Sequence, residues 1–412
     1  MGQNCSRREF LVSSLGTTGF LAAGGLSFAE TAEKVYYPSV NRPTTLPTAP
    51  VAIERCRTYD PAVLREKLNA GFNLIGGLKK LVSNKTVSIK VNVTGGPGTL
   101  ADLPGYRTYQ IHPNLLAALC AALNDAGARR MIVLESQYSP KSPEEVLTAS
   151  GWDIRAIQSA GGNRVTFQDT RNRGKWPQYS RLKVPWGGFL FPSFDVNPSY
   201  EKTDVFISLA KLKDHLSAGV TLSIKNLFGM TPTSLYGDNA PNEDSLSNRG
   251  SVLHNGMAAV AAGVPKEISQ HVPVVWNYRV PRVTADCLGA RPIDLAVIDG
   301  IETTRAGEGP WAAKAQPIQP GLLLVGRHPL CTDAIATAAM GYDPLAEHFK
   351  FPFPSENHLR LLYSVGVGEI DPKKIEVRGL PLKEAVYPFN PKHEQLDTPT
   401  AYYAHYDSRL RV

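Results

Sequence analysis

Residues 203–229 read TDVFISLAKLKDHLSAGVTLSIKNLFG, an apolar run that gives way abruptly to a group of lysines and a histidine. The apolar part, residues 204–210, is typical of a strand buried on both faces of a parallel sheet. In open α/β sheets, ligands bind just beyond the carboxyl ends of the strands. The stretch therefore predicts a buried strand with a ligand site at its end.

Further apolar runs alternate with helical patterns along the rest of the chain. Strands are predicted at residues 86–93, 130–135, 294–299 and 322–325. Helices are predicted at residues 60–81, 112–127, 143–151 and 332–340. Because strands and helices alternate and the strands are apolar, we expect an α/β fold with a mostly parallel sheet covered by helices on both faces.

The length of 412 residues suits either two lobes or one enlarged domain. A linker rich in Pro and Thr is predicted at residues 30–50, after an N-terminal signal peptide at residues 1–29. The α/β domain is expected to span residues 51–383, with an insertion or cap near residues 230–290, where the alternation stops. Residues 384–412 are predicted to form a C-terminal tail.

The start of the chain has the pattern of a twin-arginine (Tat) export signal. Arg7 and Arg8 precede Phe10 and an apolar, glycine-rich segment. Small residues up to Ala29 stand where signal peptidase requires them. We expect the Tat translocase to export the folded protein, with cleavage after Ala29, to the periplasm or another extracytoplasmic space. The alternatives are an ordinary secretory signal and an uncleaved N-terminal anchor.

Charge and hydropathy exclude several classes of protein. The 44 Lys and Arg against 37 Asp and Glu give a net charge of +7, which is spread thinly along the chain. This balance mildly favours an anionic small molecule or a membrane surface as a partner, and it favours nucleic acid only weakly. No apolar run after the signal is long enough to cross a bilayer, so we do not expect an integral membrane protein.

Cysteine is scarce, with five in the whole chain and no C-x-x-C pair. That scarcity argues against an iron–sulfur cluster and against a scaffold built on disulfides. The mature chain would keep Cys56, Cys120, Cys287 and Cys331. An oxidising compartment would permit disulfides among them, and the sequence leaves their pairing open.

The polar residues after the strand at 204–210 are the main candidates for catalysis. Lys213, His215 and Lys225 stand there among Ala, Val, Ile, Leu and Phe. A partly buried lysine can lose its proton and act as a nucleophile, or it can hold an anion. We predict electrostatic or covalent assistance from both lysines, and acid–base chemistry or metal binding by His215. The alternative is a solvated turn, with Lys225 extending its stem from a core helix.

Other strand ends supply candidate binding residues. Those predicted to hold a ligand or cofactor are Asn92, Gly95, Gly96, Lys211 and Asn226. The two glycines belong to a loop whose free amides could cradle an anion. Asp299, at another strand end, suits a hydroxyl or a cation and is predicted to be catalytic. A glycine-rich turn and an Asp-Gly turn are equally compatible with these residues.

Three histidines adjoin predicted core elements, namely His112, His215 and His254. Neutral imidazoles suit Zn, Ni, Cu or Fe, so the three are predicted to be ligands of a transition metal. Their spacing carries no metal signature, and the prediction rests on topology alone. The cofactor therefore stays open between a transition metal and a nucleotide-type group.

The pattern Lys-x-Lys-x-His at residues 211–215, followed by Lys-Asn-Leu-Phe-Gly at residues 225–229, resembles the signature of domain-of-unknown-function family 362. His254, Asp299 and Asp333 also fit that resemblance, which spans about residues 85–345. Some relatives carry a ferredoxin-like module, whose clustered cysteines this chain lacks. The resemblance implies a shared domain without an iron–sulfur role, and it implies no particular activity.

A second resemblance is to lactate racemase and its relatives. In that family a histidine is followed ten residues later by the lysine that holds a nickel-pincer nucleotide. His215 and Lys225 have the same separation, with Ala218 and Gly219 between them. The two-glycine step before the racemase lysine is Leu-Ser-Ile here. The resemblance implies a shared pocket position, and it makes Lys225 the residue to test for a covalent adduct.

These observations favour an exported enzyme that acts on an anionic or hydroxylated small molecule, with or without a metal or a covalently held cofactor. The alternative is a periplasmic small-molecule binding protein without catalysis. A cell-surface interaction module is a third reading, supported only by the polar region and the Tyr-rich tail. Bound metal or an excess intact mass would indicate the cofactor form, and turnover separates an enzyme from a binding protein.

Overall fold

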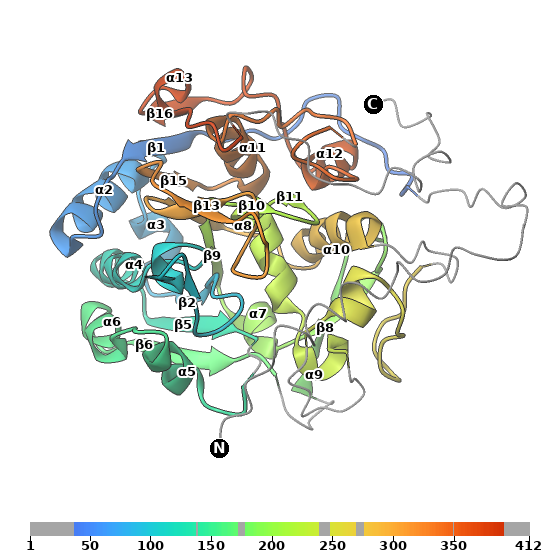
Figure 1. Ribbon diagram of the computed structural model, residues 1–412, viewed down its shortest axis with the longest axis horizontal. Helices are drawn as coiled ribbons and strands as arrows, with labels where there is room; N and C mark the ends of the chain where they lie inside the picture. Colours follow the sequence, from blue (N-terminus) through green and yellow to red (C-terminus); the bar gives the residue numbers. More distant parts are fainter. Residues whose placement is uncertain are drawn as a thin grey trace, which may run out of the picture.

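The computed structural model describes residues 37–136, 139–171, 178–238, 248–268, 276–348 and 350–390. An eight-stranded sheet runs through its centre, with helices on both sides (Figure 1). Taken across the sheet from one edge to the other, the strands are β16 (Val377–Gly379), β1 (Val51–Arg55), β15 (Leu322–Gly326), β12 (Leu295–Gly300), β9 (Val205–Lys211), β2 (Thr86–Lys90), β5 (Arg130–Glu135) and β6 (Val165–Asp169).

All strands of this sheet except β15 run in the same direction. β12, β9, β2, β5 and β6 pair in parallel, and so do β1 and β16. β15 is antiparallel to both of its neighbours, β12 and β1. Every residue of β9 and of β12 is buried, because the helices cover both faces. The predicted α/β fold with a mostly parallel sheet is confirmed.

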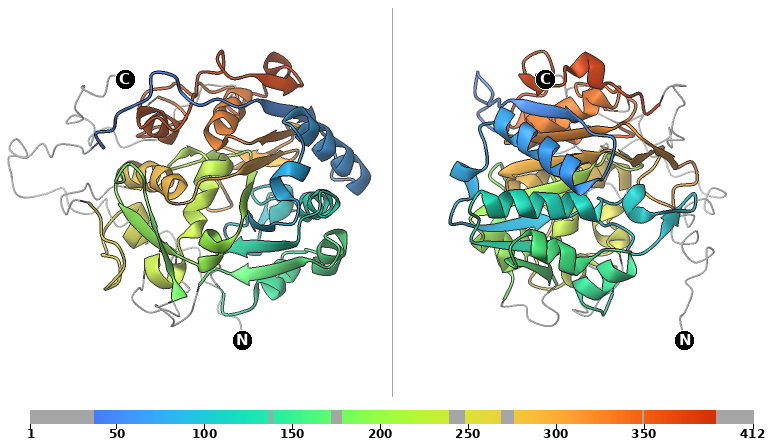
Figure 2. Two further views of the ribbon diagram at one scale, coloured as in Figure 1. Left: turned by 180° about the vertical axis from the view of Figure 1, so that it is seen from behind. Right: turned by 90° about the vertical axis from the view of Figure 1, so that its left-hand side faces the viewer.

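One face of the sheet is covered by α2 (Pro61–Leu74), α3 (Lys79–Val82), α4 (Pro113–Asp125), α5 (Pro143–Ala149) and α6 (Ile154–Ala160). The right-hand view of Figure 2 shows these helices in front of the strands. Leu68, Leu119 and Ile157 of this layer share one buried cluster with Ile89 and Ile207 of the sheet. Burial of these apolar side chains is the main force that holds the layer on the sheet.

The other face is covered by α8 (Leu222–Lys225), α10 (Trp276–Ala290), α11 (Pro329–Ala339) and α12 (His358–Ser364). Ile224, Val283 and Ile335 of this layer share a second buried cluster with Ile298 and Leu324 of the sheet. α10 packs on α8 and α12, so it caps the sheet together with its neighbours. The described part of residues 230–290 therefore helps to cover this face of the sheet.

Short elements fill the connections between these layers. The helical ones are α7 (Pro198–Lys202), α9 (Thr233–Tyr236), α13 (Leu382–Ala385), the 3₁₀ turns η1 (Gly105–Arg107) and η3 (Asn226–Met230), and the π turn η4 (Gly250–His254). The two-stranded ribbons pair β3 (Thr99–Leu100) with β4 (Leu103–Pro104), β7 (Ser180–Lys183) with β8 (Ser193–Val196), β10 (Asp214–His215) with β11 (Gly219–Val220), and β13 (Thr303–Arg305) with β14 (Gln316–Ile318).

The predicted linker ends where β1 begins, at Val51. Its described part, residues 37–50, contains neither helix nor strand. The hydroxyl of Tyr37 donates a hydrogen bond to Glu356 (2.5 Å), and Glu369 N donates to the carbonyl of Pro47 (3.0 Å). These contacts hold the segment beside α12. The predicted signal at residues 1–29 and the tail beyond residue 390 lie outside the described residues.

The four cysteines that the structure describes are core residues. Cys56, Cys120, Cys287 and Cys331 are all buried and unpaired. Burial raises the pKa of Cys120 to about 12, so that side chain stays a neutral thiol. Among the same described residues, no helix combines the length and the apolar composition that crossing a membrane requires.

Candidate functional site

The strand ends that carry the predicted site residues lie side by side. β9 pairs with β2 on one side and with β12 on the other, all in parallel, so their carboxyl ends meet at one edge of the sheet. Asn92, Lys213 and Asp299 are all at this edge or just beyond it. The structure thus brings together candidates that are far apart in the sequence, although it divides them between the two faces of the sheet.

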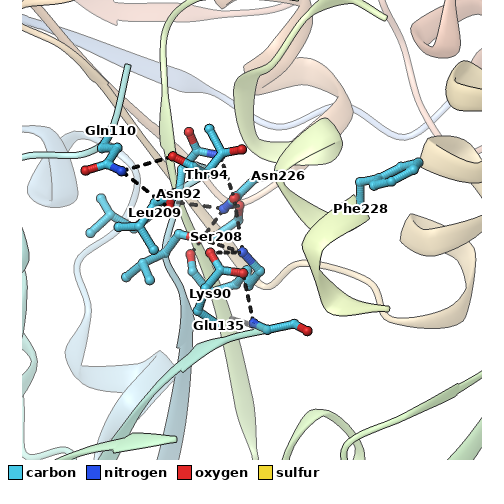
Figure 3. Close-up of polar contacts among 12 residues, drawn as sticks. Lys90, Asn92, Thr94, Gln110, Glu135, Ser208, Leu209, Asn226 and Phe228 are labelled. Atoms are coloured by element: carbon cyan, nitrogen blue, oxygen red, sulfur yellow. Dashed lines mark hydrogen bonds and ion pairs between the residues drawn. The ribbon is translucent and has the colours of Figure 1, made fainter. Parts of the chain in front are cut away.

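Asn226 links β2 and β9 to the turn η3, as Figure 3 shows. Its Nδ2 donates to the carbonyl of Lys90 (3.2 Å) and to Ser208 Oγ (3.0 Å). Its Oδ1 accepts a hydrogen bond from Asn92 Nδ2 (3.0 Å). All these side chains are buried. Asn226, predicted to bind a cofactor, therefore uses its carboxamide to fix the start of η3 against the sheet.

Lys90 is neutralised within the protein. Its Nζ donates to Glu135 Oε2 (2.7 Å) and to the carbonyl of Val91 (2.6 Å). Burial lowers the pKa of Lys90, and the Glu135 carboxylate opposes that shift. The Glu135 carboxylate thus compensates the charge of Lys90, which points to the same face of the sheet as Asn226.

Lys211 and Asp299 form a second internal ion pair, with Nζ and Oδ2 2.9 Å apart and both side chains fully buried. Asp299 also accepts hydrogen bonds from the Tyr59 hydroxyl (2.8 Å) and from the backbone N–H of His112 (3.1 Å). Its carboxylate is thus occupied by the protein's own hydroxyl and cation. We assign Lys211 and Asp299 to the framework of the site, while the ligand-binding role of Lys211 and the catalytic role of Asp299 stay predictions.

Lys213 links the loops of Tyr109 and Glu308 at the edge of the sheet. Its Nζ donates to the carbonyls of Tyr109 (2.5 Å) and Glu308 (3.0 Å). The Glu308 carboxylate accepts hydrogen bonds from Leu216 N (2.8 Å) and from Trp311 Nε1 (2.7 Å). Burial lowers the pKa of Lys213 well below its usual value. Lys213 therefore positions the loop of Glu308 next to the residues that lead to Lys225.

The glycine-rich loop packs against this second loop. Gly95 and Gly96 have φ values of +80° and +64°, which glycine adopts without strain. A Cβ on Gly95 would lie 2.7 Å from Trp311, so the close approach requires glycine. Gln110 Nε2 donates to the carbonyls of Thr94 (2.9 Å) and Gly96 (2.7 Å). The loop is held through its carbonyls, and the predicted cradling of an anion by its amides stays a prediction.

Asp333 fixes the first turn of α8, the helix that carries Lys225. The Asp333 carboxylate, fully buried on α11, accepts hydrogen bonds from Ser223 N (3.0 Å), Ser223 Oγ (2.6 Å) and Ile224 N (2.8 Å). It caps a helix other than its own. Leu222, just before these donors, has φ +48°, a conformation that non-glycine residues rarely adopt. The path of the chain into Lys225 is therefore tightly specified.

The amine of Lys225 has no such internal partner. The side chain is 8% exposed, and its Nζ lies 4.3 Å from the ring centroid of Phe228. Nζ makes no hydrogen bond or ion pair with any residue that the structure describes. Burial lowers the pKa of Lys225 to about 7; the Glu308 carboxylate opposes this shift, and the Arg249 guanidinium adds to it.

Two imidazoles lie within the electrostatic reach of Lys225, and their hydrogen bonds define their tautomers. His215 Nδ1 accepts from Ser217 N (3.1 Å), so the proton of the neutral ring is on Nε2. His254 Nδ1 faces the carbonyl of Arg249 (3.0 Å) and must donate to it, which leaves Nε2 as an acceptor. Burial, followed by the charge of Lys225, lowers the pKa of His215 well below 6.5. Burial lowers that of His254 to about 4.

The structure does not bring the three predicted metal ligands together. His112 caps α4, with its Nδ1 accepting from Asn114 N (3.1 Å), and its ring stacks on Tyr59 (3.8 Å between centroids). It faces the first helix layer, whereas His215 and His254 lie near Lys225. Within the part of the chain that the structure describes, no group of three or more His, Cys, Asp or Glu residues could hold a metal ion.

Sequence reasoning missed two residues that belong to the surroundings of Lys225. His358, at the start of α12, is fully buried, and burial together with the charge of Lys225 lowers its pKa to about 3. Arg249 is also buried, and its Nε donates to the carbonyl of Thr231 (2.7 Å). Neither residue follows a predicted strand, so no pattern in the sequence marked them. A small cleft lies beside His215 and is lined by Asp214, Gly307 and Phe351 among others.

These features define an α/β protein with an isolated, nearly buried lysine at the carboxyl edge of a parallel sheet. A family model described as "Domain of unknown function (DUF362)" matches residues 87–338, more than half of the chain, and the chain belongs to this family. No curated protein matches the chain. A solved protein from Thermotoga maritima, a structural genomics target, is 10% identical with a TM-score of 0.32. That match covers 63% of this chain and 53% of the other.

The framework role of Asp299 predicts a large effect on stability. Asp299→Asn leaves the Lys211 ammonium buried without its anion, and we expect a loss of about 3–5 kcal/mol in the free energy of unfolding. Urea unfolding followed by circular dichroism measures it. The double variant Lys211→Met, Asp299→Asn should recover most of the loss, because it removes both charges and keeps an acceptor for Tyr59 and His112. A loss below about 1 kcal/mol in the single variant, as at an exposed pair, would contradict this role.

The surroundings of Lys225 predict an unusual pH dependence of its reactivity. Only a neutral amine reacts with acetic anhydride, and the pKa of Lys225 is lowered to about 7. The acetylation rate at Lys225 should therefore rise up to about pH 7 and level off above it. An ordinary lysine in an added reference peptide keeps gaining reactivity to about pH 10. Competitive labelling with peptide mass spectrometry compares the two, and parallel curves would refute the prediction.

Proposed function

We propose that the protein is an exported enzyme that acts on an anionic small molecule through the amine of Lys225. The observation that carries the proposal is the isolation of that amine. It is nearly buried over the Phe228 ring, yet it has no hydrogen-bond or ion-pair partner among the described residues. The other buried lysines of the site all bind carboxylates or carbonyls. Because the Lys225 amine binds no other described group, it is available to a ligand.

The charges around Lys225 favour an anion. The positive charges of Arg249 and Lys90 lower the pKa of Lys225, whereas Glu308 raises it. Lys213 is also near enough for its own pKa to be lowered by Lys225. An anion entering this region would offset the repulsion between protonated Lys225 and the Arg249 guanidinium, and the same charges would attract it from solvent.

The chemistry that suits this amine is addition to a carbonyl carbon. The lone pair of a neutral lysine attacks the carbon, and the electrons of the C=O bond move to the oxygen. The amine nitrogen then gives up its protons, the oxygen leaves as water, and an imine remains. A hydrogen bond from His215 Nε2–H would stabilise the oxygen while it carries negative charge. A pKa near 7 supports this role, because about half of the amine is then neutral at neutral pH.

Trapping of the imine tests the proposal directly. Glyoxylate is a small anionic aldehyde, and cyanoborohydride reduces its imine with lysine to a stable carboxymethyl group. At pH 7 we expect one modification, at Lys225, and loss of that modification in Lys225→Met. The matched control Lys80→Met changes an exposed lysine on α3 and should leave the labelling of Lys225 unchanged.

Peptide mass spectrometry separates the outcomes. Labelling spread over lysines according to their exposure would contradict the proposed role of the amine. Tight binding of glyoxylate without an adduct at Lys225 would favour the alternative, a periplasmic binding protein without catalysis.

Export is the second part of the proposal, and the sequence around Arg7 and Arg8 supports it. Expression in a Tat-competent host should yield a periplasmic protein whose first residue is Glu30. Replacement of both arginines by lysine should keep the longer precursor in the cytoplasm. N-terminal peptide mass spectrometry of each fraction gives the result. Equal export from a host that lacks the Tat translocase would contradict the assignment.

A further inference from the structure

The ring of Phe228 is shared by two polar groups of the site. Lys225 Nζ lies 4.3 Å from its centroid, and the centroid of the His254 ring lies 4.9 Å from it. Lys225 and Phe228 come from adjoining turns, α8 and η3, while η4 brings His254 from a separate part of the chain. After burial, the charge of Lys225 contributes to the lowered pKa of His254, so the two groups lie close enough for one small ligand to contact both.

The two groups have opposite hydrogen-bonding character. His254 Nδ1 is committed to the carbonyl of Arg249, so its Nε2 can only accept a hydrogen bond. Lys225 in its protonated form can only donate. Neither Lys225 Nζ nor His254 Nε2 has a hydrogen-bond partner among the described residues. Neither atom is among the buried polar atoms that are fully enclosed without such a partner. Both atoms therefore remain open to a ligand.

The turn that carries His254 holds this arrangement in place. η4 is a π turn, a feature that is rare and frequent at functional sites. It starts next to Arg249, whose Nε donates to the carbonyl of Thr231 at the end of η3. The carbonyl that fixes the tautomer of His254 is thus itself tied to the segment of Phe228. Burial keeps the ring neutral, which preserves its acceptor.

On the basis of the proposed function, we propose that the site selects anions that also carry an N–H or O–H donor. Lys225 holds the anionic group, and His254 Nε2 accepts a hydrogen bond from the donor. His254 is then a residue that contacts the ligand and determines its class. An anion without a donor would leave His254 Nε2 desolvated and unpaired, which weakens binding.

Sulfamate and methanesulfonate form a matched pair of probes for this proposal. Both are monoanions with the same sulfonate group, and an amino group in the first replaces a methyl group in the second. We expect sulfamate to bind the wild-type protein about tenfold more tightly, as one satisfied hydrogen bond implies. Calorimetric titration at constant ionic strength measures both affinities.

Variants assign the preference to its residue. His254→Phe keeps an aromatic ring beside Phe228 and removes the acceptor, so the two probes should bind equally. His254→Gln keeps an acceptor and should retain part of the preference. Lys225→Met should weaken both probes. Thermal unfolding without anions shows whether each variant is folded.

The outcomes separate this inference from the proposed function. Equal binding of the two probes to the wild type, or a preference that survives in His254→Phe, would overturn the selection of donors. If labelling of Lys225 by glyoxylate persists in that case, the proposed function stands. If neither probe binds, the inference fails, and glyoxylate labelling shows whether the amine is reactive without an anion-binding site.

Discussion

The buried carboxamide of Asn226 is the contact on which the geometry of the site depends. It donates to groups on β2 and β9 and accepts a hydrogen bond from Asn92, so it joins the sheet to η3. Lys225 immediately precedes it, and Phe228 follows two residues later. An aspartate could not donate these hydrogen bonds, and an apolar residue would leave buried polar groups unpaired. The positions of the amine and of the ring beneath it both follow from this one side chain.

Charge compensation distinguishes the framework lysines from the candidate functional one. Lys90 and Lys211 are paired with carboxylates, and Lys213 donates to two carbonyls. Such pairing offsets the cost of removing an ammonium group from water. Lys225 has no comparable partner among the described residues, and burial lowers its pKa to about 7. A site that holds a partly neutral amine beside the Arg249 guanidinium is suited to a ligand that is both anionic and electrophilic.

Apolar patterning predicted five of the eight strands of the sheet, namely β2, β5, β9, β12 and β15, and the edge at which the candidate site lies. It missed β1, β6 and β16. The strand at residues 130–135 has the predicted bounds, and the lysines after β9 lie at the carboxyl edge as expected. Pairing between distant residues could not be predicted. The sequence predicts a ligand contact for Lys211 because it does not show that Asp299 neutralises this lysine. It also predicts a metal ligand at His112, where the structure has the cap of a helix whose first turn begins with a proline.

The measurement that tests the central claim most directly is a crystal structure of the protein after treatment with glyoxylate and cyanoborohydride at pH 7. The account predicts continuous density from Lys225 Nζ into a carboxymethyl group, with the imidazoles of His215 and His254 nearby. An unmodified Lys225 in crystals whose exposed lysines are modified would contradict it.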